Sequence, residues 1–288
     1  MMPASHFPLT SCNEMLEDLD ALLAAQQPPC PTGIAPLDEV LNGGLNDELV
    51  VIGGVPGAGK TDLAINLTAA IAQLRPVIYV SFELPKKQLF LRLLSCTAGK
   101  ADSTRALTEQ QIRNSPTNME LTQRLAWTAN NLYSIGNNIM FADAAAQAIE
   151  VEKFLTVEDL RAVVATQKAV TGVAPAVAID YLQEFTAGND HGTTSTDTLD
   201  YLARHLAAMA HIDETPVIVL SSMAKDGSFR GSAHISHAAD IALVIKPSAS
   251  NSALMASKPI DVEVAKNRSG RSGMTIQLSY TPELHLFS

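Results

Sequence analysis

The sequence has little positive charge, few cysteines and no long apolar run, and each shortage excludes a class of protein. The 288-residue chain has 30 Asp and Glu against 20 Lys and Arg, which gives a net charge of −10. A protein coated in basic surface for duplex DNA is excluded, although a local channel can still be positive. No apolar run approaches the roughly 20 residues that span a bilayer, and residues 1–6 lack the basic start of a secretion signal. We therefore expect a cytoplasmic protein with no membrane partner.

The cysteines are too few and too scattered to define a disulfide framework or a metal site. Cys12, Cys30 and Cys96 are odd in number and far apart in the sequence. This usage suits reduced thiols in a cytosol, and none of the three has a catalytic context. With 47% apolar and 17% charged residues the chain is globular. Its length suits one α/β domain with a short extension.

The most informative motif is a complete phosphate loop of the form G-x-x-x-x-G-K-[ST]. It consists of Gly54, Val55, Pro56, Gly57, Ala58, Gly59, Lys60 and Thr61. An apolar run at 49–52 precedes it and a helix-forming run at 62–67 follows it. Its glycines let backbone N–H groups turn inward, and the helix adds the positive end of its dipole. We predict that this loop and Asp62 bind a nucleotide, ATP, with Lys60 on the β- and γ-phosphates and the Thr61 hydroxyl on Mg²⁺.

Residues 1–30 read as a separate N-terminal segment. Ser11 and Glu14 have the spacing of a capping box, which predicts an amphipathic helix over 11–25. Its apolar face comprises Met15, Leu16, Leu19, Leu22 and Leu23. The proline-rich stretch at 26–31 then forms a stiff linker. Such a helix either folds back onto its own domain or docks on a neighbouring subunit, and the residues alone do not choose.

Residues 31–288 alternate between strand and helix patterns, which predicts an α/β fold with a mainly parallel sheet covered on both faces. We expect parallel strands at 49–53, 77–82, 138–142, 176–179, 217–221 and 241–245. We expect helices at 60–74, 86–97, 119–133, 157–170 and 196–211. Thr108 with Gln111 and Thr156 with Asp159 offer N-terminal caps, and Gly172 ends a helix. The last part, 260–265 and 274–280, predicts an antiparallel strand pair.

Two carboxylates follow apolar strands and are candidates for the chemistry. Asp180 ends the strand at 176–179, where an acid next to a phosphate loop holds Mg²⁺. The alternative is an Asp that caps a helix or a loop. Glu83 follows the strand at 77–82, so its carboxylate falls on the same rim as Lys60. From position alone, Glu83 is either the base that activates water or an exposed loop acid.

Short blocks along the chain carry a family resemblance. They are Pro31-Thr32-Gly33, Leu37-Asp38, Gly43-Gly44-Leu45, the phosphate loop, Ser81-Phe82-Glu83-Leu84, Gln88-Leu89, Arg92-Leu93-Leu94-Ser95, Ile179-Asp180-Tyr181-Leu182-Gln183, Val217-Ile218-Val219-Leu220-Ser221, Arg230-Gly231-Ser232, Ala239-Asp240 and Lys266-Asn267-Arg268-Ser269-Gly270. Together they resemble the C-terminal motor domain of bacterial replicative DNA helicases, the DnaB-like branch of the RecA-type ATPases. The resemblance runs from about residue 31 to the C-terminus.

The resemblance implies a RecA-like ATPase that works as a ring. Glu83 matches the catalytic glutamate of the family, and Asp180 matches its Mg²⁺-linked aspartate. Lys266 and Arg268 match a basic pair that reaches the γ-phosphate of the neighbouring subunit's ATP. Without the family, the loop containing this pair reads as a solvated turn. A homo-oligomer, hexameric in this family, is implied, and the N-terminal helix resembles the linker helix by which neighbours hold one another.

Three departures from the family pattern bear on function. Ser221-Ser222-Met223 stands where the family places a glutamine that couples the γ-phosphate to the DNA-binding loops, and a serine lacks the reach of an amide. The next loop offers only Lys225 and Arg230 to DNA phosphates, so we expect modest, salt-sensitive binding to single strands. Residues 1–30 are too few for the N-terminal domain with which replicative members build the ring and contact primase.

We carry three functional hypotheses forward. The first is an ATP-dependent helicase motor that translocates on single-stranded DNA and unwinds duplex during replication with other replication proteins. The second is a recombinase-like or accessory DNA-dependent ATPase without unwinding, which the missing glutamine favours. The third is an ATP-binding regulatory switch that contacts a partner helicase through the N-terminal helix, which the acidic balance favours.

Overall fold

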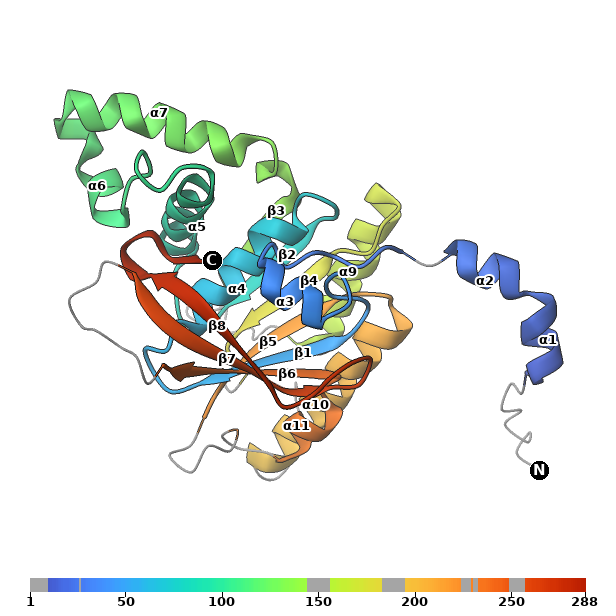
Figure 1. Cartoon of the computed structure of the whole chain (residues 1–288). Coiled ribbons are helices and arrows are strands. Elements are labelled where there is room, and N and C mark those ends of the chain that lie inside the picture. Colours follow the sequence, from blue (N-terminus) through green and yellow to red (C-terminus); the bar gives the residue numbers. More distant parts are fainter. Residues whose placement is uncertain are drawn as a thin grey trace.

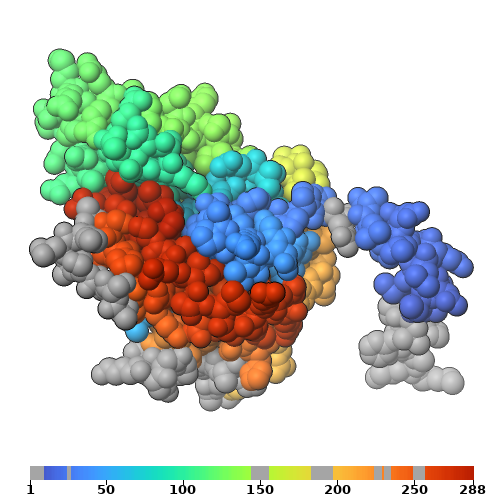
Figure 2. All heavy atoms as spheres, in the orientation of Figure 1, coloured from blue at the N-terminus to red at the C-terminus, as the bar shows by residue number. Residues whose placement is uncertain are grey.

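The computed structural model describes residues 10–25, 27–143, 156–182, 195–223, 229, 233–248 and 257–288. Figures 1 and 2 show a main body from which an N-terminal segment projects. Lys225 and Arg230, which we predict to meet DNA, lie outside the described residues. Among the described helices, none has the length and apolar character that a membrane span requires.

The described strands form one nine-stranded sheet in the order β3-β2-β4-β5-β1-β6-β7-β8-β9. Their bounds are β1 Leu49–Gly54, β2 Val77–Ser81, β3 Ile139–Asp143, β4 Ala176–Asp180, β5 Val217–Ser222, β6 Ile241–Pro247, β7 Lys258–Asn267, β8 Met274–Thr281 and β9 Leu286–Phe287. The six strands from β3 to β6 are parallel, and β6 to β9 are antiparallel. This confirms the predicted parallel sheet and C-terminal antiparallel pair, and adds the short strand β9.

Helices cover both faces of the sheet, as Figure 1 shows. The described α-helices of the body are α3 Ala35–Val40, α4 Lys60–Ile71, α5 Lys86–Ala101, α6 Glu109–Asn114, α7 Met119–Tyr133, α9 Val157–Thr171, α10 Ser195–Ile212 and α11 Ala233–Ala238. Of these, α6 and α7 pack on α5 and lie away from the sheet. Val50 and Ile52 of β1 belong to the core cluster that contains α4 and α5, whereas Leu49 and Val51 belong to the cluster that contains α9 and α10. A strand buried on both faces must be apolar throughout, which explains why β1 has no polar side chain.

The predicted helix signals are confirmed, and two helix ends differ from the predicted ones by more than one residue. Thr108 and Thr156 form capping boxes, and Gly172 ends α9 in the left-handed region with φ +77°. The helix predicted at 60–74 ends at Ile71, and residues 72–74 form a turn. The helix predicted at 86–97 continues to Ala101.

The N-terminal helix predicted over 11–25 is wrong in one respect. The capping box at Ser11 is present, but the segment divides into α1 Cys12–Glu17 and α2 Leu19–Ala25, with Asp18 leaving helical geometry at φ −94°, ψ 7°. The apolar side chains of this segment are 43% to 60% exposed, and Figure 1 shows α1 and α2 apart from the body. The chain does not fold these helices back onto its own domain.

Candidate active site

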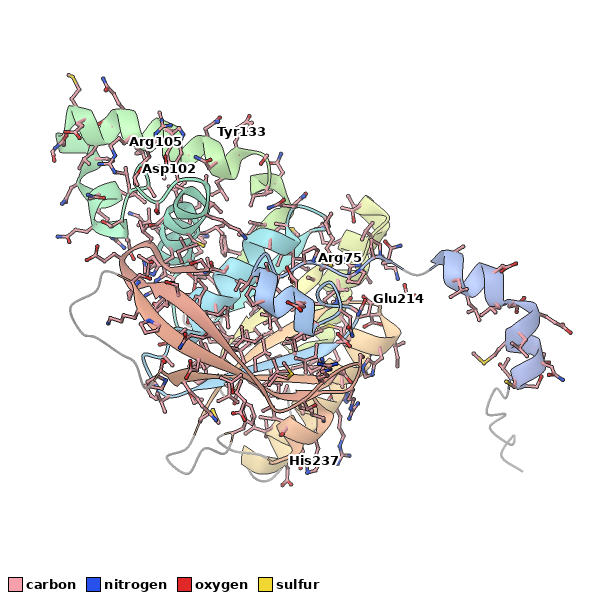
Figure 3. All side chains as sticks on the ribbon, in the orientation of Figure 1. Arg75, Asp102, Arg105, Tyr133, Glu214 and His237 are labelled. Carbon is pink, nitrogen blue, oxygen red and sulfur yellow. The ribbon has the colours of Figure 1, made fainter. Side chains whose placement is uncertain are left out.

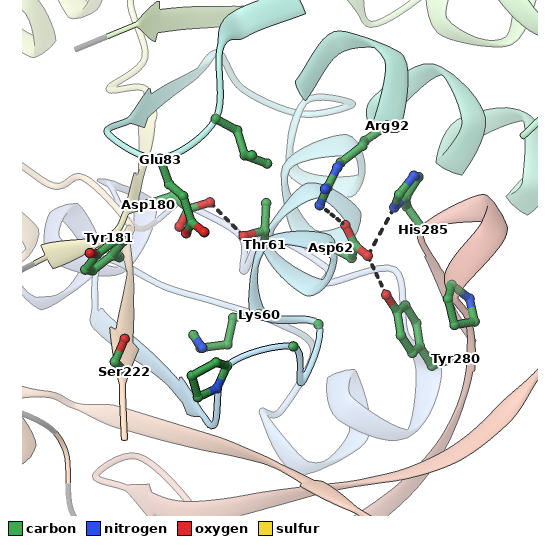
Figure 4. Close-up of a pocket in the computed structure, with 15 residues that line it drawn as sticks. Lys60, Thr61, Asp62, Glu83, Arg92, Asp180, Tyr181, Ser222, Tyr280 and His285 are labelled. Carbon is green, nitrogen blue, oxygen red and sulfur yellow. Dashed lines mark hydrogen bonds and ion pairs between the residues drawn. The ribbon is translucent and has the colours of Figure 1, made fainter. Parts of the chain in front are cut away.

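The phosphate loop connects the central strand β1 to the helix α4 (Figure 4). Gly57 and Gly59 have φ angles of +78° and +94°, a region that only glycine enters without strain. The Lys60 ammonium donates to the carbonyls of Gly54 at 2.9 Å and Val55 at 3.3 Å. Burial lowers the pKa of Lys60, against the opposing effect of nearby carboxylates. The loop is thus shaped as a cradle in which backbone donors and one lysine face the same space.

Asp180 lies beside this cradle at the end of β4, as its strand pattern predicts. Its Oδ2 accepts hydrogen bonds from the Thr61 hydroxyl at 2.8 Å and from the Tyr79 hydroxyl at 3.2 Å. Burial is the main cause that raises the pKa of Asp180 to about 6, and the Glu83 charge adds to it, while the bond from Thr61 opposes it. A carboxylate and a hydroxyl that already touch supply the oxygen donors that Mg²⁺ prefers.

These groups line a single cavity of about 540 Å³. Its lining includes Lys60, Thr61, Asp180 and Glu83 together with Ser222, and Figure 4 shows these side chains around one space. Glu83 is exposed at the rim, where its carboxylate is accessible to water. The structure therefore brings together the predicted phosphate, metal and base residues of one chain. Their individual roles stay predictions.

Sequence reasoning missed a buried cluster around Asp62. Its carboxylate contacts Arg92 at 3.0 Å, the Tyr280 hydroxyl at 2.5 Å and His285 Nδ1 at 3.1 Å (Figure 4). Burial acts to raise the pKa of Asp62, but the bonds from His285 and Tyr280 and the Arg92 charge outweigh it, so this pKa is lowered. The side chain of Asp62 thus ties the phosphate loop to the C-terminal segment, and its predicted contact with nucleotide stays untested.

That C-terminal segment packs directly on the phosphate loop. Phe287 stacks on Tyr280 with ring centroids 4.5 Å apart. A Cβ at Gly59 would come within 3.1 Å of the Phe287 ring, so the glycine is needed for close packing as well as for its φ angle. Asn66 of α4 donates to the His285 carbonyl at 2.8 Å. A local signal for this packing is lacking, because its partners are more than 200 residues apart in the chain.

Lys266 and Arg268 lie near the N-terminal ends of β1 and β6, whereas the phosphate loop follows the C-terminal end of β1. Ala242 pairs with Val51 on one side and with Lys266 on the other, which places Lys266 near the start of β1. The loop leaves β1 from its other end, after Gly54. Neither basic side chain therefore reaches the phosphate loop of its own chain, which suits residues that act on a neighbour.

Both basic side chains bind groups of their own chain near α11. Lys266 Nζ donates to the carbonyls of Ser236 at 2.8 Å and His237 at 2.9 Å. Arg268 donates to Asp240 Oδ1 at 2.9 Å and to the His237 carbonyl at 2.9 Å. His237 is labelled on α11 in Figure 3. Burial and then the Arg268 charge lower the pKa of Lys266. These bonds order both side chains, although the loop at 268–273 is exposed to solvent.

A parallel sheet whose central strand feeds a phosphate loop, with an aspartate on a nearby strand bonded to the loop threonine, defines a RecA-like P-loop nucleotide-binding protein. The sequence model of the DnaB-like helicase C terminal domain matches residues 30–288, and the chain belongs to that family. The resemblance seen in the sequence motifs is confirmed.

Relatives in sequence agree with this assignment. A probable replicative DNA helicase of Guillardia theta is 29% identical over 201 residues, which cover 69% of this chain and 31% of the relative. Replicative DNA helicase DnaB of Geobacillus stearothermophilus is 26% identical over 288 residues, 95% of this chain and 58% of the relative. The chain thus spans between about a third and three fifths of the length of these relatives.

A solved structure has the same fold. It is a DnaB-like replicative helicase, described together with its interactions with primase. The TM-score is 0.78 at 21% identity, and the match covers 96% of this chain and 68% of that chain. At this level of identity the likeness supports the fold, and the family assignment rests on the sequence model.

Proposed function

We propose that the protein is an ATP-hydrolysing motor of the replicative helicase type, which binds ATP at the interfaces of a homo-oligomeric ring. The observation that carries this proposal is the separation of the two halves of the site. The phosphate loop leaves one end of β1, whereas Lys266 and Arg268 lie by the other end. A head-to-tail ring brings one edge of each subunit against the opposite edge of the next, and so completes every site.

Each residue has a defined part in the proposed reaction. Lys60 and the N–H groups of residues 54–61 hold the phosphates, and Glu83 orients a water and accepts its proton. Thr61 and Asp180 hold Mg²⁺, which neutralises phosphate charge when bound. Lys266 and Arg268 of the next subunit stabilise the charge that develops on the γ-phosphate, a role worth about 10³- to 10⁵-fold in kcat for an arginine.

The ring gives a use to the exposed helices α1 and α2. Their side chains Met15, Leu16, Leu19, Leu22 and Leu23 are on average half exposed, and a chain in solution gains stability by covering such a surface. Docking on a neighbouring subunit supplies the cover. With each site shared between subunits, hydrolysis then becomes linked to the relative position of two domains.

The ring moves along single-stranded DNA and separates duplex during replication, in company with other replication proteins. Lys225 and Arg230 are the cations that we predict to face the strand. A replication motor works where the DNA is, so we expect a cytoplasmic location.

A mixing experiment tests the shared site. The variants Lys60→Ala and Arg268→Ala should each lose ATP hydrolysis, by about 10³-fold or more, while Arg268→Ala still binds a fluorescent ATP analogue. An equimolar mixture should regain activity, because some interfaces combine an intact phosphate loop with an intact arginine. Absence of recovery in assembled mixed rings contradicts the proposal.

Strand displacement on a forked DNA tests the motor itself. We expect unwinding that requires ATP and Mg²⁺ and that Lys60→Ala abolishes. The specific observation in favour of the second candidate, a DNA-dependent ATPase without unwinding, is that Ser222 and not a glutamine lines the cavity. DNA-stimulated hydrolysis with filament growth and no displacement supports that candidate. Hydrolysis that only a partner helicase elicits supports a regulatory switch.

A further inference from the structure

The two carboxylate oxygens of Asp240 bind different partners. Oδ2 accepts from the Leu49 backbone N–H at 2.9 Å and lies 2.8 Å from His211 Nε2. Oδ1 accepts from Arg268 at 2.9 Å. The carboxylate is 6% exposed, so the first oxygen fixes the group to the buried start of β1. The second oxygen is then a fixed acceptor for the half-exposed Arg268 side chain.

Arg268 is held in two directions by this acceptor and by the end of α11. One terminal nitrogen of the guanidinium donates to Asp240 and the other donates to the His237 carbonyl at 2.9 Å. The Arg268 backbone N–H also donates to the Asp240 carbonyl at 3.0 Å. The side chain is nevertheless 50% exposed. A guanidinium has five N–H donors in a rigid plane, so donors remain for a phosphate after these bonds form.

We propose that Asp240 is the positioning residue for Arg268 in the intersubunit reaction, an inference that rests on the proposed function. An exposed arginine samples many rotamers, and fixing one of them at the transition state costs free energy. Asp240 and the His237 carbonyl fix one rotamer of Arg268 when the protein folds, so this cost does not add to the barrier of the reaction. The guanidinium then reaches the neighbour's γ-phosphate already oriented, which speeds the chemical step without tightening the binding of ATP.

A purely structural role for Asp240 makes a different prediction. The Leu49 N–H lies at the start of β1, the strand that leads to the phosphate loop of the same chain. If Asp240 served only to hold that strand, its loss would damage the phosphate-loop half of the site. If it positions Arg268, its loss damages the arginine half. Rings that mix the Asp240 variant with a variant lacking one half of the site show which half the Asp240 substitution damages.

The test is the Asp240→Asn variant, because an asparagine that still accepts from Leu49 turns its amide N–H₂ toward Arg268. We expect kcat for ATP hydrolysis to fall by about 10- to 100-fold, as for a misplaced catalytic group, with the Kd for an ATP analogue changed by less than about twofold. Mixing with Lys60→Ala subunits, which carry an intact arginine half, should restore activity. Mixing with Arg268→Ala subunits should not.

The reverse pattern, recovery with Arg268→Ala and none with Lys60→Ala, overturns the inference, and so does an unchanged kcat. Recovery in the Lys60→Ala and Arg268→Ala mixture shows that the shared site itself is intact, so failure of the inference and failure of the proposed function are distinguishable. If Asp240→Asn does not assemble, Asp240→Glu goes through the same mixtures with the same expected pattern. Asp213→Asn is the matched control, because it breaks a carboxylate–arginine pair, with Arg161 at 2.7 Å, that includes neither Asp240 nor Arg268, and its kcat should stay at the wild-type value.

Discussion

At the scale of single residues, Asp180 is a buried carboxylate whose negative charge lowers the stability of the folded protein. It is 2% exposed, and burial raises its pKa to about 6. The folded nucleotide-free protein therefore binds a proton at Asp180 more tightly than the unfolded chain does. Free energy of unfolding is lost as pH rises from about 4 to about 6, and above that pH the whole cost is present.

We expect Asp180→Asn to stabilise the nucleotide-free protein at pH 8 by about 1 to 3 kcal/mol, because the amide carries no charge to desolvate and can still accept from Thr61. The gain should shrink as pH falls through about 6 toward about 4. Urea unfolding of both proteins over that pH range measures the difference. A variant less stable than wild type at pH 8 contradicts the expectation. Asp143→Asn, at the end of β3, is a control for changing a strand-end carboxylate.

At the scale of elements, the C-terminal segment supports the helix that follows the phosphate loop. β8, the 3₁₀ turn Pro282–Leu284 and β9 place Tyr280, His285 and Phe287 against Gly59, Asp62 and Asn66. Phe287 is 2% exposed and its backbone N–H donates to Asn66 Oδ1 at 3.1 Å. The cradle thus depends on packing from a distant part of the chain.

Phe287→Ala should lower the free energy of unfolding by about 3 to 5 kcal/mol, since it removes a buried ring and leaves a cavity beside the loop. Chemical denaturation measures the loss, and ATP-analogue binding should weaken with it. Phe90→Ala is the matched control, because Phe90 on α5 is 45% exposed and its loss should cost less than about 1 kcal/mol. An equal loss in the free energy of unfolding for the two variants would show that Phe287 contributes no more to stability than an exposed phenylalanine.

The elements also show which features local sequence predicts. Capping residues such as Thr108 and Thr156 and the apolar run of β1 act through near neighbours, so their signals lie within a few residues. The division at Asp18 has no such signal because the apolar pattern continues through it. The Asp62 cluster was hidden for another reason: Tyr280 and His285 reach Asp62 only through the fold. The family resemblance gave Lys266 and Arg268 a role, but only the sheet showed that they lie far from the phosphate loop.

At the scale of the whole molecule, the proposed ring depends on the apolar surface of the projecting helices α1 and α2. The double variant Leu19→Ser, Leu23→Ser removes apolar surface from α2 without touching the body, so we expect the ring to dissociate toward monomers and ATP hydrolysis to fall with it. Light scattering at several protein concentrations measures the mass. The control Glu17→Ser, Asp20→Ser changes the polar face of the same segment and should assemble. A double leucine variant with wild-type mass contradicts docking through α2.

The bond between Asn66 and the His285 carbonyl joins positions 219 residues apart, and β9 is the last strand of the sheet in chain order. A ribosome delivers a chain from its N-terminus, so α4 emerges long before the strand that packs against it. Throughout that interval Asn66 lacks its bonds to His285 and Phe287, and Asp62 lacks its bonds to Tyr280 and His285. The helix that follows the phosphate loop therefore gains its C-terminal support only after residues 280–287 have been made. We therefore expect ATP binding to develop late in synthesis, after β9 has been made.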